Sequence, residues 1–203
     1  MKWHPVTILL AACVAGAGSA AVAASDLKDG DIVFQTSSSR QSKAIQLATH
    51  SPYSHMGILF REDGRWMVYE AVQPVKRTPL QQWMDRGISG SDIVKRLKNR
   101  ERYLSGQKAA DLRKATRRYL GKPYDRAFGW SDDRIYCSEL VWKSYKSATG
   151  LELGSLKQLR AFDLSSPDVQ QGLHERYGEK VPLDEPVISP ADIFESPLLE
   201  TLR

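Results

Sequence analysis

The sequence predicts one α+β domain, with strands in the first half of the chain and helices in the second. Two apolar segments, 54–60 and 66–72, have the character of strands, and the Asp63-Gly64 pair between them is typical of a tight β-hairpin turn. Two later segments, 106–120 and 137–149, have apolar residues at helical spacing and are followed by glycines. No repeat, linker or low-complexity tract divides these parts.

The remaining elements are predicted from shorter signals. Residues 31–35 and 92–97 are expected to be strands, and 39–49 a helix whose apolar side holds alanine, isoleucine and leucine. Ser105 is expected to cap the 106–120 helix and Gly121 to end it. Two Ser-Pro pairs each predict the start of a short helix, since proline favours the first helical turn: Ser166-Pro167 and Ser189-Pro190.

Residues 1–23 have the pattern of a secretory signal peptide. Lys2 precedes an apolar run over 6–14, which is followed by small residues and an Ala-Val-Ala stretch suited to cleavage. The run is short for a membrane-spanning helix. We therefore expect an exported, periplasmic protein whose domain occupies 24–203. The alternative is a lipoprotein, because residues 10–13 (LAAC) resemble a lipobox whose Cys13 would tether the protein to a membrane.

The net charge of +5 is modest, and the basic residues are scattered except on one predicted helix. Arg113, Lys114, Arg117 and Arg118 are expected to form a solvated face of that helix. The alternative is contact with anionic lipid head groups or envelope polymers at a membrane surface. Nucleic acid is not an expected partner of an exported chain.

The hairpin allows a prediction of which side chains meet. A turn centred on Asp63-Gly64 places Gly57 opposite Glu70 and His55 opposite Val72, with open space at the glycine. His55 and Glu70 then become diagonal neighbours on one face, about 7 Å apart at the backbone. A carboxylate in an apolar strand needs a polar partner, and an imidazole N–H can supply it. The two residues are candidates for a general base and the group that orients it.

Cys137 is the strongest candidate nucleophile. It is the only cysteine outside the predicted leader, and it stands at the start of a predicted helix. A helix N-terminus stabilises a thiolate by only about 0.3–2 kcal/mol, so a neighbouring imidazolium must supply most of the activation. His4 belongs to the leader, His50 is expected to cap the end of the early helix, and His174 lies among polar residues, which leaves His55. The alternative reading is a buried, inert cysteine and a hydrogen-bonded core histidine.

Several motifs resemble one enzyme family. They are 41–50 (QSKAIQLATH), 54–58 (SHMGI), 69–72 (YEAV), 121–125 (GKPYD) and 136–142 (YCSELVW). Together they resemble the permuted papain-like enzymes of the NlpC type, in particular the YiiX/YaeF-like bacterial group related to lecithin retinol acyltransferase. The resemblance implies an antiparallel half-barrel sheet packed on the cysteine-bearing helix. It also implies Cys137 as nucleophile, His55 as base and Glu70 as the third polar residue.

Other polar residues near these motifs have less specific readings. Tyr124 and Tyr53 are candidates for an oxyanion or substrate contact beside the Cys137 backbone N–H, although a structural role is favoured for both. Asp125, Asp132 and Asp133 are expected to serve turns and caps, because no set of histidines and cysteines with ligand spacing accompanies them. Neither a metal nor a cofactor is expected.

The predicted function is a cysteine hydrolase or acyltransferase that cleaves an amide or ester through a thioester intermediate. The expected substrate is a small lipid-like amide or ester, or a cell-wall peptide. The alternative class is a non-catalytic lipid- or peptidoglycan-binding module. Two segments, 73–100 and the region after 151, are expected either to cover the sheet or to wall an apolar cleft with these side chains: Leu80, Trp83, Met84, Ile88, Leu153, Leu156, Leu159 and Phe162.

Overall fold

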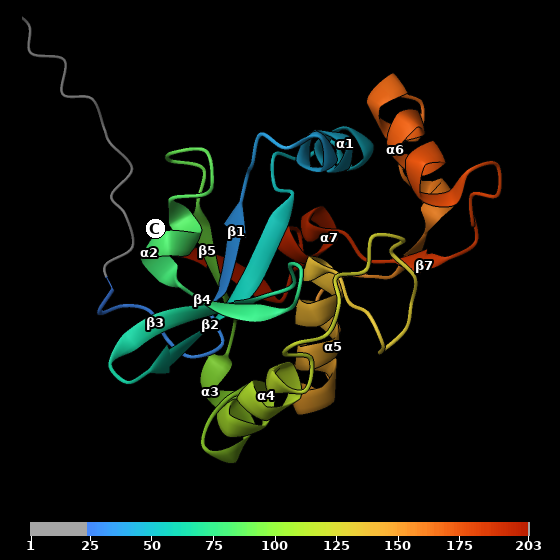
Figure 1. Ribbon diagram of the computed structural model, residues 1–203. Coiled ribbons are helices and arrows are strands. Elements are labelled where there is room, and N and C mark those ends of the chain that lie inside the picture. Colours follow the sequence, from blue (N-terminus) through green and yellow to red (C-terminus); the bar gives the residue numbers. More distant parts are fainter. Residues whose placement is uncertain (1–23, 203) are drawn as a thin grey trace, which may run out of the picture.

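The computed structural model describes residues 24–202 (Figure 1). The predicted leader and its Cys13 lie outside these residues. Within the described part of the chain, no helix is both long enough and apolar enough to cross a bilayer.

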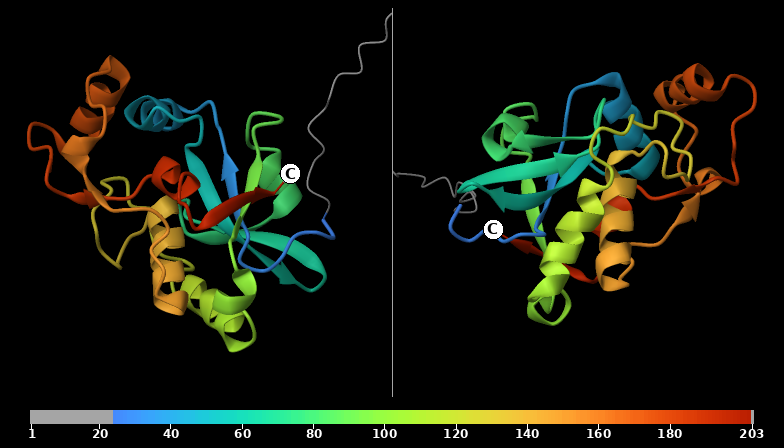
Figure 2. Two further views of the ribbon diagram at one scale, coloured as in Figure 1. Left: turned by 180° about the vertical axis from the view of Figure 1, so that it is seen from behind. Right: turned by 60° about the horizontal axis from the view of Figure 1, so that its bottom comes forward.

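A six-stranded antiparallel sheet organises the molecule, and its strand order is β4-β3-β2-β1-β5-β8. The C-terminal strand β8 lies at the edge beside β5, as the red arrow in Figure 2 shows. Two further strands, β6 and β7, pair separately. The bounds are β1 Ile32–Gln35, β2 His55–Glu62, β3 Arg65–Glu70, β4 Lys76–Pro79, β5 Ile93–Leu97, β6 Lys157–Gln158, β7 Pro186–Val187 and β8 Leu199–Leu202.

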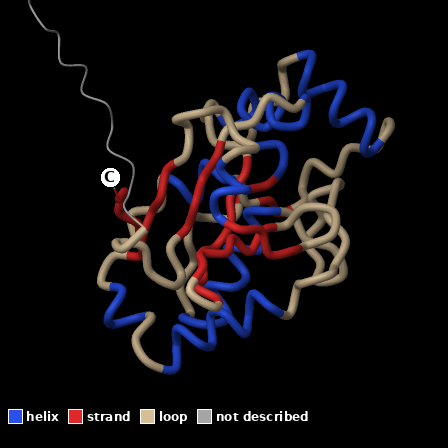
Figure 3. Tube along the Cα trace, turned by 60° about the vertical axis from the view of Figure 1, so that its left-hand side comes forward, coloured by secondary structure: helices blue, strands red, loops and turns tan. Residues whose placement is uncertain are grey.

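The helices surround the strands, as the blue segments of Figure 3 show. Helix α5 packs on β2 and is covered by α4, and α1 packs against α6 at the opposite end (Figure 1). The bounds are α1 Arg40–Thr49, α2 Leu80–Met84, α3 Arg100–Tyr103, α4 Gln107–Arg117, α5 Cys137–Thr149, α6 Pro167–Tyr177 and α7 Pro190–Phe194, with a 3-10 turn at Leu159–Ala161. The predicted α+β class and the sheet packed on the cysteine-bearing helix are confirmed.

The helix boundaries follow local signals in most places. Ser39 accepts a hydrogen bond from the Ser42 amide at 3.1 Å and so caps α1, and the two Ser-Pro pairs open α6 and α7 as predicted. The prediction for α4 was wrong at both ends. Gly106, not Ser105, is its N-cap, and Arg118 ends it before Gly121 is reached. The positive φ of 55° at Gly106 explains why a glycine stands there.

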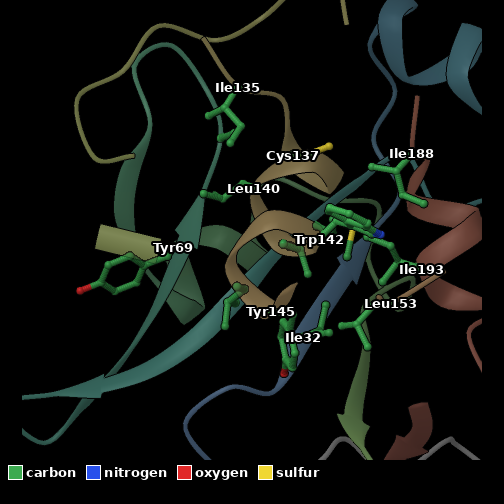
Figure 4. Close-up of a cluster of buried hydrophobic side chains, with 14 of the residues drawn as sticks. Ile32, Tyr69, Ile135, Cys137, Leu140, Trp142, Tyr145, Leu153, Ile188 and Ile193 are labelled. Carbon is green, nitrogen blue, oxygen red and sulfur yellow. The ribbon is translucent and has the colours of Figure 1, made fainter. Parts of the chain in front are cut away.

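The two faces of the sheet are buried against different helices. Alternate strand residues such as Ile32 and Ile58 pack with α5 in the main core. Figure 4 shows Ile32 in this core beside the helix. On the other face, Val33 and Val68 pack with Trp83 of α2 in a second core. Leu80 and Met84 pack against this second core as well, so of the two alternatives for this part of the chain these residues fulfil the one in which it covers the sheet.

The predicted hairpin register is confirmed. Asp63 and Gly64 both have positive φ, and Gly57 pairs with Glu70. Two details differ from the prediction. Because β3 ends at Glu70, His55 forms no pair with Val72 and instead pairs with Gln35 of β1.

The second difference concerns Gly57, which leaves no open space. A Cβ there would lie 2.5 Å from Val68 Cγ1 and 2.7 Å from the Tyr69 carbonyl oxygen. The glycine therefore allows β2 and β3 to approach closely beside Glu70.

Gly57→Ala is expected to destabilise the protein by about 1–3 kcal/mol, because the added methyl group meets a backbone carbonyl that cannot move without disturbing the ladder. Urea unfolding measures the change. Gly64→Ala in the hairpin turn is a useful comparison, since a Cβ there meets no atom within 4 Å and the cost arises from its positive φ alone. An unchanged midpoint for Gly57→Ala would contradict the close approach of the strands.

Candidate active site

The hairpin brings His55 and Glu70 into contact. The Nε2 atom of His55 lies 2.6 Å from Glu70 Oε2, and the Glu70 side chain is fully buried. The indole ring of Trp83 stacks on the imidazole with 6.0 Å between the ring centroids. The ring of His55 is therefore fixed by a carboxylate at one nitrogen and by an aromatic neighbour on its face.

Glu70 binds more than the histidine. The Thr78 hydroxyl and the Arg86 guanidinium each donate to Glu70 Oε1 at 2.5 Å. These two partners were missed in the sequence. Thr78 lies on β4 opposite Val68, a diagonal neighbour of Glu70 on the same face, so the register of a recognised β4 would have revealed it. Arg86 follows α2 and has no such signal. Three donors thus satisfy this buried carboxylate.

The contacts shift the pKa values of both groups in opposite directions. Burial by itself would lower the pKa of His55, but hydrogen bonds with Cys137 and Glu70, together with their negative charges, raise it to about 9. Burial would raise the pKa of Glu70, but its bonds from His55 and Thr78 and the charge of Arg86 lower it to about 2. At neutral pH the site therefore favours an imidazolium beside a carboxylate.

Cys137 is the first residue of α5, as predicted, and its side chain is only 3% exposed. Figure 4 shows it on the first turn of the helix, near Ile188. The flanking residues hold this turn in place, because Ser138 Oγ donates to the Ile188 carbonyl at 2.8 Å and the Ile188 amide donates to the Tyr136 hydroxyl at 3.1 Å. Since Nε2 of His55 bonds to Glu70, Nδ1 is the ring nitrogen left to interact with the thiol.

The two candidate tyrosines have different surroundings. Tyr124 lines the cleft beside His55, and its hydroxyl accepts a hydrogen bond from Gln41 Nε2 at 2.9 Å. Burial and the negative charge of Cys137 raise the pKa of Tyr124, so its hydroxyl keeps its proton. Tyr53 instead stacks on Phe194 with 4.2 Å between centroids and lines neither cavity described below, so the structure does not bring it to the site.

Two neighbouring cavities lie beside His55 and Cys137. The larger, of about 770 Å³, is lined largely by polar and charged side chains and by His55. The smaller, of about 80 Å³, is lined by Cys137 and by aliphatic and aromatic side chains, among them Leu159 and Phe162. Ala44, Ile45 and Arg176 line both, so the cavities are neighbours. The apolar lining expected from the region after 151 is thus present at Leu159 and Phe162.

The other members of that expected lining lie elsewhere. Leu153 is buried in the main core, and Leu156 and Ile88 are exposed.

The remaining acidic and histidine candidates bind groups close to them. Asp125 accepts the Ala127 amide at 2.8 Å, which is the turn role predicted for it, while Asp132 binds Lys143 at 2.8 Å. The exposed histidines pair with surface carboxylates: His50 with Asp163 and His174 with Glu179.

Comparison with known proteins identifies the family of the chain. The family model described as permuted papain-like amidase enzyme, YaeF/YiiX, matches residues 26–203. The chain is 53% identical over 173 residues to the protein YiiX of Escherichia coli, covering 85% of this chain and 84% of that protein. A crystal structure of YiiX from Escherichia coli, described as a metalloprotein, matches with a TM-score of 0.82 at 51% identity, covering 87% of this chain and 96% of that one. The chain therefore belongs to the permuted papain-like amidases of the YaeF/YiiX type.

Proposed function

We propose that this protein is a cysteine hydrolase or acyltransferase that cleaves an amide or ester through a thioester on Cys137. The observation that carries the proposal is the placement of His55, whose Nε2 bonds to the buried Glu70 carboxylate while the neighbouring Cys137 helps to raise the pKa of the imidazole. A nucleophile, a base and a group that orients the base are the parts that nucleophilic acyl transfer requires.

The proposed reaction proceeds in two steps. The thiol of Cys137 passes its proton to His55, and the sulfur attacks the substrate carbonyl carbon. The tetrahedral intermediate collapses as its nitrogen or oxygen leaving group takes the proton from the imidazolium, which leaves an acyl thioester. Water then gives a proton to His55 and attacks the thioester, releasing the acid and the thiol. An acceptor alcohol or amine in place of water gives acyl transfer.

The developing oxyanion needs donors at the nucleophile. The backbone N–H of Cys137 at the helix N-terminus is one. The Tyr124 hydroxyl is proposed as the second, because Gln41 donates to its oxygen and leaves the phenolic hydrogen free to donate. Gln41 is then a positioning residue that sets the direction of this hydrogen.

The apolar pocket beside the sulfur favours a substrate with an acyl chain over a cell-wall peptide. Its lining is dominated by aliphatic and aromatic side chains, and it opens where the acyl group of a thioester would be held. Export to the periplasm, with a Cys13-linked membrane anchor as the alternative, remains a proposal that fits such a substrate.

A metal ion enters no step of this proposal. The solved YiiX is described as a metalloprotein, and a protein-bound catalytic metal uses about three side-chain donors. Among residues 24–202, no three His, Cys, Asp or Glu side chains are placed to hold one ion. Glu70, which could join Cys137 and His55, already accepts bonds from His55, Thr78 and Arg86. The described donors therefore do not fit a resident metal.

Acylation of the intact protein tests the proposal. N-acyl amides and aryl esters of increasing length, from acetyl to decanoyl, are expected to add one acyl group to Cys137, detected by intact mass after acid quenching. Each buried methylene is expected to raise kcat/KM by up to about fourfold, the equivalent of about 0.8 kcal/mol.

Two outcomes would contradict parts of the proposal. A flat response to chain length, together with turnover of γ-glutamyl or muropeptide amides, would assign the enzyme to the cell-wall peptidases. Absence of acylation, with no reaction of Cys137 with iodoacetamide at pH 6, would favour the non-catalytic binding module, since an activated thiolate reacts well below the range of a free thiol.

A further inference from the structure

We propose that the polar cleft holds an anionic group on the departing part of the substrate, bound by Arg126 and Arg134. This inference rests on the proposed function, and it assigns the leaving group rather than the acyl group. It starts from the observation that His55 lines the polar cleft, whereas Cys137 lines the apolar pocket.

The chemistry of the two steps fixes which part of the substrate lies in which cavity. The acyl group is bonded to sulfur in the thioester and so must lie on the side of Cys137. The leaving amine or alcohol takes its proton from His55, and a proton donor must lie within hydrogen-bonding reach of its acceptor. The leaving group therefore lies on the side of His55, in the larger, polar cleft.

Positive side chains outnumber negative ones in the lining of this cleft. Its two carboxylates are already paired, Asp168 with Lys43 at 2.7 Å and Glu175 with Arg40 at 3.4 Å. Arg126 and Arg134 also line it, yet within residues 24–202 neither guanidinium makes an ion pair or a hydrogen bond. An excess of positive charge therefore faces the space in which the leaving group is released.

The neighbouring groups do not neutralise these arginines. Arg176, a further arginine of the cleft, lies over the Phe128 ring at 4.9 Å and adds to the positive charge. Asp125 is on the same loop but does not line the cleft, and its carboxylate accepts the Ala127 amide. Guanidinium groups bind carboxylates and phosphates in a fork geometry, so the expected ligand chemistry is one of these anions.

The test compares substrates that share an acyl chain and differ only in the charge of the departing amine. N-decanoylglycine releases an anionic amine, N-decanoylglycinamide a neutral one, and N-decanoyl-ethylenediamine a cationic one. Wild-type kcat/KM is expected to be about tenfold higher for the glycine compound than for its amide, the equivalent of about 1.4 kcal/mol. Higher salt should reduce this preference, because the guanidinium groups are exposed.

Two double variants test whether Arg126 and Arg134 cause the preference for an anionic leaving group. Arg126→Ala/Arg134→Ala should bring the ratio of kcat/KM for the glycine compound to that for its amide down to about one, and Arg126→Glu/Arg134→Glu should shift the preference to the cationic compound. Arg117→Ala is the matched control, since Arg117 is exposed on α4 and lines neither cavity. Equal rates on all three compounds in an active enzyme would overturn the anion site and leave the proposed function intact.

A binding measurement separates this inference from turnover. Calorimetry on the Cys137→Ala protein is expected to give tighter binding of N-decanoylglycine than of N-decanoylglycinamide. Equal affinities would overturn the anion site whether or not the enzyme is active. Failure of the wild type to form any acyl-enzyme would instead contradict the proposed function.

Discussion

Cys137→Ala is expected to abolish hydrolysis, by about 10⁴-fold or more in kcat, while the protein stays folded. The sulfur is the atom that bonds to the substrate in the proposed mechanism, and nothing else on the first turn of α5 replaces it. The structural cost is small, because the alanine keeps the helix start and the bonds of Tyr136 and Ser138 to Ile188 do not involve the thiol. Amide turnover and the thermal midpoint measure the two effects.

Ser144→Ala is the matched control for this variant. Ser144 is a small, fully buried side chain on the same helix, and its hydroxyl has no hydrogen-bond partner within the described residues. Its loss should leave both activity and stability close to wild type. Turnover by Cys137→Ala near the wild-type rate would exclude the nucleophile assignment, whereas loss of activity in both variants would point to packing of α5.

Glu70→Gln is expected to lower kcat by up to about 10⁴-fold, because a neutral amide no longer stabilises the imidazolium and can hold the ring in the wrong tautomer. The basic limb of the pH profile is expected to move with it. In the wild type, His55 keeps its proton up to a pKa of about 9, partly through the Glu70 carboxylate. Without that charge the pKa falls, so activity should be lost at lower pH. A kinetic pH profile of both proteins provides the measurement.

The same variant has a defined effect on stability. His55 has a pKa of about 9 when folded against 6.5 as its reference, so its contribution is complete below pH 6.5 and is lost as pH rises toward 9. Glu70 has a pKa of about 2 against 4.5, so its contribution is present above pH 4.5 and is lost as pH falls toward 2. The wild type should therefore exceed Glu70→Gln in free energy of unfolding by the largest amount between about pH 4.5 and 6.5.

Urea unfolding across this pH range checks the expectation. Glu62→Gln is the matched control, since Glu62 is a carboxylate on the same hairpin that binds Tyr69 and Arg77 away from the cleft. The difference in free energy of unfolding between Glu62→Gln and the wild type should not change with pH as His55 loses its proton. A pH profile for Glu70→Gln that coincides with the wild type would contradict the role of Glu70 in orienting and charging the histidine.

The parts of the site that were predictable depend on short-range signals. The Asp63-Gly64 turn sets the register of β2 and β3, and register alone brings His55 next to Glu70. Helix α5 was equally predictable, because its apolar residues have helical spacing and Gly150 ends it.

The parts that were missed depend on contacts between distant segments. Strand β4 is four residues long, with Lys76 and Arg77 at its start and Pro79 at its end, so it has no alternating pattern, and Thr78 went unnoticed. The placement of Trp83 beneath His55 follows from which face of the sheet α2 covers, a choice that hydrophobicity alone does not determine. Gly57 was misread for a similar reason, since the close approach of β3 is a property of the pair of strands.

The proposed nucleophile and its proposed base come from opposite layers of the molecule. His55 and Glu70 project on the same side of the sheet as Trp83, whereas Cys137 is carried by α5 on the other side, and the two groups meet where β2 begins. The packing of α5 on β2 joins them, and no loop residue takes part in the proton transfer proposed here. The order in which the chain delivers the strand and the helix is then irrelevant to the chemistry. A permuted papain-like chain can therefore carry the strand before the helix and still place the two proposed reactive side chains together.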